Sequence, residues 1–264
     1  MVILGYVAAL LIGISLGLIG GGGSIITVPV MVYLFGISPL MATSYSLCIV
    51  GTTSLVGAYK NYQKKLINFR TAIYFGSSSI ATVFLTRKLI IPNIPKVLFH
   101  FDSFVVTAPL FTMVVFALLM IAASISMIKE NKFDSKTNAY KTDVWKIIFI
   151  GILIGLVTGL LGAGGGFLII PALVLIMKLS MKEAVGTSLL IIAVNSLIGF
   201  LADLGHFVLD WKLLIEITCI AIVGLLIGST FSSKMDSQKL KKGFGWFVLI
   251  MGIFILVKEI FFMK

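Results

Sequence analysis

Two stretches of the sequence decide the fold: GLIGGGGSIITVP at residues 17–29 and GLLGAGGGFLIIP at residues 159–171. Each stretch places a cluster of glycines between two apolar runs. Glycine in a helix costs about 1 kcal/mol relative to alanine, so several in succession predict a break in the helix. Because the two stretches lie 142 residues apart, the same break is predicted once in each half of the chain.

The similarity between the halves continues beyond the glycine clusters in the same register. A shift of 142 residues places Ser46 on Ser188, and it places the loop residues 67–70 (INFR) on 209–212 (LDWK). We therefore predict an internal duplication. Its parts are a first transmembrane repeat at 1–128, a polar linker loop at 129–144 and a second transmembrane repeat at 145–264.

The composition indicates that lipid is the solvent for most of the chain. Of its 264 residues, 59% are hydrophobic and 12% are charged, whereas soluble domains are about 45–50% apolar and about 25% charged. These values exclude a soluble enzyme and a disordered chain. The apolar runs lie at about 2–19, 24–35, 40–59, 71–91, 104–128, 145–161, 166–177, 184–202, 211–231 and 243–262. Since a full span needs roughly 20 apolar residues, we predict an all-α, polytopic membrane protein of about eight to ten helical segments. Whether the two short runs after the glycine breaks span the membrane or re-enter is left open.

The formal net charge of +11 is carried by the loops between the apolar runs. Lys and Arg concentrate on the cytoplasmic side of membrane proteins. Five crossings per half put fifteen of the 21 basic residues on one side and six on the other, which favours two inverted repeats over parallel repeats of four crossings. We expect both termini outside, the linker loop in the cytoplasm and the lipid bilayer as a partner. No nucleic-acid binding is expected, and the formation of a homodimer is left open.

The helix that restarts after each glycine break is the candidate binding site for a small anion. Its first turn has free N–H groups and a partial positive charge, and glycine lets a ligand approach the backbone closely. Broken helices at matching positions of two repeats are typical of a transporter's binding site. The candidate backbone and cap donors are Gly22, Gly23, Ser24, Gly164, Gly165 and Gly166. The alternative is close helix packing, which is our interpretation of Gly13-x-x-x-Gly17 and Gly224-x-x-x-Gly228.

Hydroxyl and amide side chains on the third run of each half are the candidate side-chain ligands. They are Ser46, Thr187, Ser188 and Asn195. In hydrocarbon such groups either bridge helices or line a polar path, and both alternatives stay open. Because no Lys or Arg is expected deep in an apolar run, the anion site is predicted to be neutral. Glu216, well inside a run, is either a coupling site or a side chain that reaches the interface.

No feature of the sequence predicts catalysis, a metal site or a cofactor. The Gly-x-x-x-x-Gly-Lys-Ser/Thr pattern of a phosphate-binding loop does not occur, and neither a buried nucleophile–base pair nor a pair of buried aspartates is visible. Asp203-x-x-His206 is interpreted as a solvated turn, and Cys48 and Cys219 as buried free thiols. We therefore predict that the protein is not an enzyme.

The duplicated glycine breaks, the Ala-x-x-Thr-Ser-Leu segment at 184–189 and the Asp-Trp-Lys loop at 210–212 resemble the sulfite exporter TauE/SafE family. This family is also called the 4-toluene sulfonate uptake permease family. The resemblance covers nearly the whole chain and implies a secondary carrier of the bacterial inner membrane for sulfur-containing anions, such as sulfite or sulfonates. Tyr45 stands where the family has Thr, and Asn68-Phe69 stands where it has Asp-Trp, so the site is expected to be asymmetric.

We expect this carrier to work by alternating access, with the anion held between the two glycine breaks. The alternatives left open are a passive anion channel and a membrane scaffold or enzyme.

Overall fold

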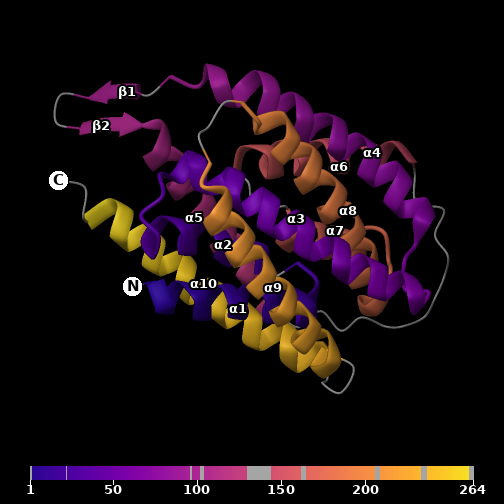
Figure 1. Ribbon diagram of the computed structural model, residues 1–264. Helices are drawn as coiled ribbons and strands as arrows, with labels where there is room; N and C mark the ends of the chain where they lie inside the picture. The colour runs from indigo at the N-terminus through magenta and orange to yellow at the C-terminus, as the bar shows by residue number, and fades with distance from the viewer. Residues whose placement is uncertain are drawn as a thin grey trace.

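A computed structural model describes residues 2–21, 23–95, 97–101, 104–129, 144–161, 165–205, 209–232 and 237–261. These residues form ten α-helices in two series of five (Figure 1). The first series is α1 (Val2–Ile19), α2 (Gly23–Tyr33), α3 (Pro39–Gln63), α4 (Phe69–Leu85) and α5 (Ala108–Ile128). The second series is α6 (Val144–Leu161), α7 (Gly166–Leu175), α8 (Met181–Asp203), α9 (Trp211–Ser232) and α10 (Ser237–Phe261). The bounds follow the apolar runs of the sequence closely, which confirms the predicted all-α fold of about eight to ten helical segments.

The segment between α4 and α5 departs from the predicted helices. It contains a π-helical turn η1 (Thr86–Ile90), a 3₁₀ turn η2 (Ile91–Asn93) and the antiparallel strands β1 (Val97–Phe101) and β2 (Phe104–Thr107). The apolar run predicted at 104–128 therefore begins as a strand and becomes helical only at Ala108. Pro109 in the first turn of α5 and the Thr107 side chain, which accepts a hydrogen bond from the Leu110 N–H, favour that helix start. The β-hairpin projects from the helices at the left-hand end of Figure 1.

Side-chain caps determine where two of the inner helices begin. At the start of α4, the Asn68 side chain accepts a hydrogen bond from the Thr71 N–H. At the start of α8, Ser180 and Glu183 form a capping box, in which each side chain accepts from the other residue's backbone N–H. Such caps satisfy donors that the helix itself leaves free, and each contributes about 1 kcal/mol.

Small-residue faces join helices of one half to helices of the other. Gly13 of α1 lies against Ala221 of α9, and Gly17 lies against Ser229, so α1 and α9 run in the same direction. The glycines of α6 pack likewise against α4, in the pairs Gly151 with Ser78 and Gly155 with Ser79, and against the start of η1, where Gly159 meets Thr86. These contacts confirm the close packing predicted for the glycine repeats.

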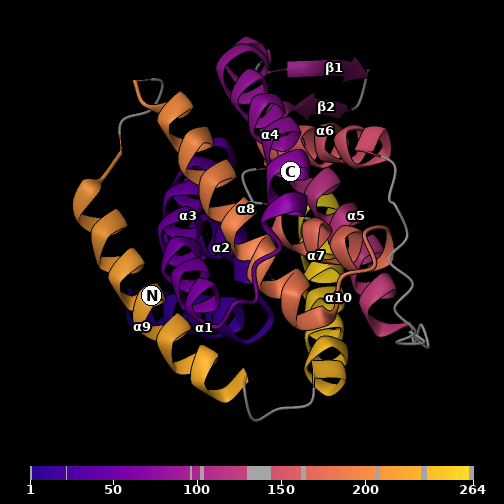
Figure 2. The ribbon, with the colours of Figure 1, turned by 90° about the vertical axis from the view of Figure 1, so that its right-hand side faces the viewer.

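The central helices α3 and α8 pack against each other in opposite directions. Leu47 of α3 lies against Gly199 of α8, whereas Gly57 lies against Leu189. Figure 2 shows this pair between α9 on one side and α6 on the other. α3 and α8 hold equivalent places in the two halves, and an inverted duplication requires equivalent helices to be antiparallel. The orientation of the two halves relative to a membrane stays a prediction.

The first glycine break turns the chain back on itself. Gly23 at the start of α2 lies against Ile12 and Leu16 of α1, while Phe35, just beyond α2, lies against Gly5. α1 and α2 therefore form a helical hairpin, and α2 returns toward the end at which α1 begins. The tip of this hairpin carries the glycine cluster into the interior of the molecule.

Large apolar side chains lie on the outside of the helices. Trp145 is 78% exposed, Ile73 and Ile250 are each 63% exposed, and Leu201 is 62% exposed. Extensive apolar surface of this kind marks contact with a membrane. Among the described residues, α3, α6, α8 and Trp211–Phe231 of α9 are long and apolar enough to cross a bilayer. The chain is a multi-pass membrane protein.

Candidate functional site

Polar side chains gather in the interior, on the facing helices α3 and α8. The buried polar residues of α3 are Thr43, Ser44, Ser46, Thr53 and Ser54, and those of α8 are Thr187, Ser188, Asn195, Ser196 and Asp203. Burying polar groups is costly unless they find partners, so such a concentration requires an explanation. We call these ten residues the polar core.

The two glycine breaks meet inside the molecule. Gly21 of the first break lies against the backbone of Gly166, and a Cβ added to Gly166 would lie 2.6 Å from the Cα of Gly21. Two backbones can approach this closely only where both residues lack a side chain. The contact brings together the two breaks that were predicted to flank an anion. For Gly21 and Gly166 it also agrees with the alternative interpretation, in which the glycines serve close packing. Gly22 and Gly164 lie outside the described residues.

A helix begins at each break. α2 begins at Gly23, and the Ser24 hydroxyl in its first turn donates to the Gly21 carbonyl oxygen at 2.7 Å. α7 begins at Gly166, and Gly165 before it has a φ of +69°, a conformation that favours glycine. The Thr158 hydroxyl lies against Gly165 and has no hydrogen-bond partner within the described ranges. At the first break the Ser24 hydroxyl therefore bonds to the protein backbone. At the second break the Thr158 hydroxyl makes no such bond and is a candidate donor for a ligand.

The candidate ligands Ser46, Ser188 and Asn195 differ in their partners. The Ser188 hydroxyl donates to the Val185 carbonyl oxygen of its own helix at 2.9 Å. The Asn195 amide donates to the Ser79 hydroxyl of α4 at 2.6 Å and therefore bridges two helices. The Ser46 hydroxyl and the Asn195 carbonyl oxygen are buried with no partner in the part of the chain described. Bridging thus accounts for the Asn195 amide. A polar path through the Ser46 hydroxyl and the Asn195 carbonyl oxygen stays a prediction.

Thr187 and Tyr45, which are equivalent in the two repeats, make equivalent hydrogen bonds. The backbone N–H of Asn68 donates to the Thr187 hydroxyl at 2.9 Å. The backbone N–H of Asp210 donates to the Tyr45 hydroxyl at 2.6 Å. The tyrosine that departs from the family pattern therefore keeps the contact, and each residue holds the start of a helix of the other half, α4 for Thr187 and α9 for Tyr45.

Glu216 joins two packed helices. Its carboxylate on α9 accepts a hydrogen bond from the Tyr6 hydroxyl of α1 at 2.5 Å. The side chain is half-buried and lies beside the seam between α1 and α9. A role in ion coupling stays a prediction for this residue.

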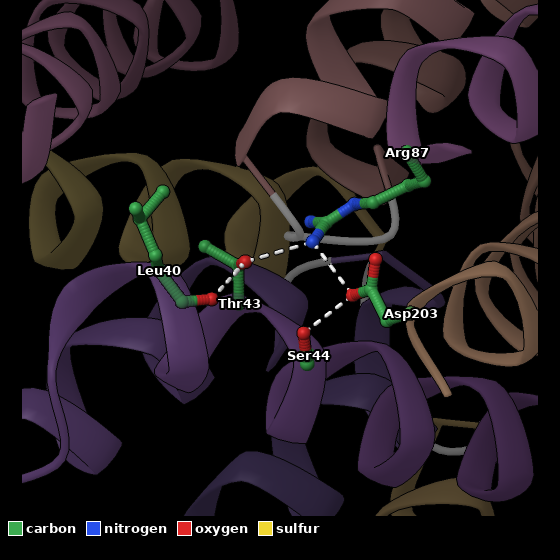
Figure 3. Close-up of polar contacts among 5 residues, drawn as sticks. All are labelled: Leu40, Thr43, Ser44, Arg87 and Asp203. Atoms are coloured by element: carbon green, nitrogen blue, oxygen red, sulfur yellow. Dashed lines mark hydrogen bonds and ion pairs between the residues drawn. The ribbon is translucent and has the colours of Figure 1, made fainter. Parts of the chain in front are cut away.

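A buried ion pair corrects the expectation that no arginine lies deep in an apolar run. Arg87 in η1 and Asp203 at the end of α8 are joined by a 2.9 Å contact between Nη1 and Oδ2, and their side chains are 0% and 1% exposed (Figure 3). Nη1 also donates to the Thr43 hydroxyl at 2.9 Å, and the Ser44 hydroxyl donates to the Asp203 carboxylate. The prediction of a solvated turn at Asp203 was also wrong, and its second member, His206, lies outside the described residues.

The sequence does carry a signal for this pair. Arg87 falls inside the apolar run predicted at 71–91, and Asp203 directly follows the run at 184–202. A shift of 142 residues places Arg87 on Ser229 and Asn61 on Asp203, so neither charge has a charged counterpart. A charge at the end of an apolar run, with no charged counterpart in the other half, indicates a residue that needs a partner, although it does not identify that partner.

A comparison with known protein families matches residues 5–255 to the family described as "Sulfite exporter TauE/SafE". A "Probable membrane transporter protein" of Xylella fastidiosa (strain 9a5c) is 26% identical over 253 residues, which cover 93% of this chain and 91% of that protein. The "Probable membrane transporter protein YdhB" of Bacillus subtilis (strain 168) is 29% identical over 250 residues, covering 93% and 96%.

An archaeal protein is similar over a comparable length. The "Probable membrane transporter protein MJ0441" of Methanocaldococcus jannaschii is 24% identical over 271 residues, covering 97% of this chain and 94% of that protein. No solved structure matches the chain. The names of these relatives point to transport and not to enzymatic activity. The family match over nearly the whole length confirms the resemblance found in the motifs, and the chain belongs to the TauE/SafE sulfite exporter family.

Proposed function

We propose that the protein is a secondary transporter that moves small sulfur-containing anions, such as sulfite or sulfonates, across the bacterial inner membrane by alternating access. The observation that carries this proposal is the contact between the two glycine breaks in the interior, where Gly21 lies against Gly166. Helix breaks at matching positions of two repeats are the usual construction of a binding site in secondary transporters. Membership of the family supports the transport of an anion.

The start of each short helix supplies groups that attract an anion. Gly23 begins α2, and Gly165 precedes the first residue of α7. The free N–H groups of such a first turn carry a partial positive charge of about half an electron. The buried hydroxyls of Ser46 and Thr158, which lack partners among the described residues, are further donors for an anion.

The packing of the helices provides elements that can move against one another. α1 and α9 form one glycine-packed pair, and α4 and α6 form another. Each pair takes one helix from each half, and the antiparallel helices α3 and α8 lie between them. We propose that one pair rocks against the other about the α3–α8 contact, which would open the centre to one side of the membrane at a time.

Counterflow of labelled sulfite and sulfonates in liposomes tests this proposal. The wild-type protein is expected to accumulate label against preloaded substrate, which a passive channel does not do. Gly165→Leu and Gly23→Leu are expected to abolish the counterflow, because the new side chains occupy the first turns of α7 and α2. Gly76→Ala is the matched control, since the added Cβ would meet only Ile191 at 3.9 Å.

Each rival function predicts a different result. Flux without counterflow would favour a passive channel, and no flux of these anions would favour a scaffold or an enzyme. Counterflow that persists in folded Gly165→Leu and Gly23→Leu proteins would show that the anion does not bind at the breaks.

Ser46→Ala separates binding from folding. The Ser46 hydroxyl has no partner in the described part of the chain, so its removal is expected to leave the melting temperature unchanged or raised. We expect the affinity for the transported anion to fall by about three- to tenfold, the effect of one hydrogen bond. Thr218→Ala is the control, because that hydroxyl bonds to the Leu214 carbonyl oxygen outside the polar core. Equal affinity in Ser46→Ala and wild type would remove Ser46 from the site.

A further inference from the structure

We propose that the free edge of the Arg87 guanidinium binds the transported oxyanion through two parallel hydrogen bonds. This inference rests on the proposed function and deepens it, because it adds the donors of a guanidinium, whose charge is paired with Asp203, to a site otherwise built from helix ends and hydroxyls. The ligand class is an anion with two or more oxygens on one central atom, which includes sulfite, sulfonates and carboxylates.

The hydrogen bonds of Arg87 leave one edge of the group unused. Nη1 makes both contacts to protein, with the Thr43 hydroxyl and with the Asp203 carboxylate. Thr43 donates its own hydrogen to the Leu40 carbonyl oxygen, so its oxygen is oriented to accept from Arg87 (Figure 3). Nε and Nη2 have no partner among the described residues. These two nitrogens share an edge of the planar guanidinium and form the fork that matches the two oxygens of an oxyanion.

Burial makes the unused fork significant. The Arg87 side chain is 0% exposed, so bulk water does not reach Nε and Nη2. Charged donors buried without a partner are strongly unfavourable, and native structures leave few of them. An ion pair satisfies the charge of Arg87 through one nitrogen only, whereas an oxyanion on the fork would satisfy the other two.

Arg87 belongs to the segment that packs against the end of α6, directly before the second glycine break. Arg87 directly follows Thr86, which lies against Gly159 near the end of α6. The neighbouring Thr158 has its hydroxyl against Gly165, the residue that precedes α7, and this hydroxyl also lacks a partner in the described ranges. The segments that carry Arg87, a free hydroxyl and a helix N-terminus thus pack against one another, and each of these groups favours an anion.

Asp203 permits the anion to bind and to leave. Its Oδ2 accepts from Nη1 and from the Ser44 hydroxyl, whereas its Oδ1 and the fork make no hydrogen bond within the described ranges. Arg87 and Asp203 together are electrically neutral, so the cluster does not hold an anion as tightly as an unpaired arginine would. Moderate affinity of this kind is what a carrier needs to release its substrate.

Binding to the purified full-length protein tests the inference, with sulfite, methanesulfonate and bromide as the probes. Arg87→Lys keeps a positive charge beside Asp203 but replaces the fork with a point charge. We expect it to weaken sulfite or methanesulfonate binding about tenfold or more, and to weaken bromide binding much less, because a single atom cannot use two parallel bonds. The rise in melting temperature with ligand concentration gives the dissociation constants.

A second variant tests whether misfolding, and not the missing fork, causes a loss of binding. Arg87→Gln combined with Asp203→Asn removes both charges and leaves neither of them unpaired, and we expect the same loss of oxyanion binding. Lys60→Gln is the control, because Lys60 donates to Ser229, the repeat counterpart of Arg87. Its oxyanion binding is expected to match that of the wild type.

The outcomes separate this inference from the function on which it rests. Suppose that the wild type binds and transports oxyanions and that both Arg87 variants bind them equally well. The fork then does not bind the anion and the inference is wrong, while the proposed function stands. If Lys60→Gln weakens binding as much as Arg87→Lys, the effect is one of general charge and the inference is also wrong. If the wild type neither binds nor transports any oxyanion, both proposals fail together.

Discussion

Replacing Arg87 by methionine is expected to lower the free energy of unfolding by about 3–5 kcal/mol, or to prevent the protein from accumulating. The substitution leaves the Asp203 carboxylate buried beside Ser44 without its cation. An uncompensated buried charge is far more costly than the loss of an exposed ion pair. Thermal and denaturant unfolding in detergent micelles measures the change.

The double variant Arg87→Met/Asp203→Leu tests the reason for this loss. Removing both charges together is expected to restore most of the stability, to within about 1–2 kcal/mol of the wild type, since apolar replacements of buried pairs are often tolerated. Lys60→Met is the matched control, because its partly exposed contact with Ser229 is worth less than about 1 kcal/mol. If Arg87→Met were no more harmful than Lys60→Met, the buried pair would be unimportant for stability.

Adding one methyl group at Gly166 is expected to separate the two glycine breaks. The Cβ of Gly166→Ala would lie 2.6 Å from the Cα of Gly21 and 2.7 Å from Cδ1 of Ile192. The isoleucine side chain can move, but the backbone of Gly21 is held in the hairpin tip between α1 and α2. We expect a loss of about 1–3 kcal/mol from overpacking, seen as a lower melting temperature in detergent.

The same change at Gly243, Gly243→Ala, is expected to raise the stability instead of lowering it. Gly243 lies in α10, and a Cβ there would meet no atom within 4 Å. Alanine is favoured over glycine in a helix by about 0.5–1 kcal/mol, so this variant is expected to be slightly more stable than the wild type. If Gly166→Ala had the same melting temperature as the wild type, the contact between the two breaks would not contribute to the stability of the fold.

The helices were largely predictable, because hydrocarbon allows few alternatives to a continuous helix. The run predicted at 2–19 coincides with α1, and the run at 145–161 differs from α6 by one residue. The duplication predicted two breaks that flank one site, but the direct contact between Gly21 and Gly166 was not predicted. The start of α5 was missed, because the apolar run gives no sign that its first residues pair with β1 rather than continue the helix.

The buried pair was missed for a different physical reason. Hydropathy along the chain reports how apolar a segment is, and it does not report which segment ends come together. Arg87 and Asp203 are 116 residues apart, and each is individually acceptable as a residue at the end of a helix. Only the packing of the end of α8 against η1 removes both from water. The equivalent hydrogen bonds of Thr187 and Tyr45 were also missed. The two side chains differ in length, and only the packing of the two halves shows that both accept from a backbone N–H at the start of a helix.

The buried pair also makes the two ends of the antiparallel α3–α8 pair chemically different. At the end where α3 begins, Arg87 and Asp203 tie η1 to α8, whereas their counterparts at the opposite end are Ser229 and Asn61, which carry no charge. If the protein alternates between two conformations as proposed, an ion pair at one end only is expected to make them differ in energy. Such a carrier is expected to show unequal half-saturation from the two sides of a membrane. Its net direction of flow is still decided by the gradients, since a difference between resting states cannot drive transport.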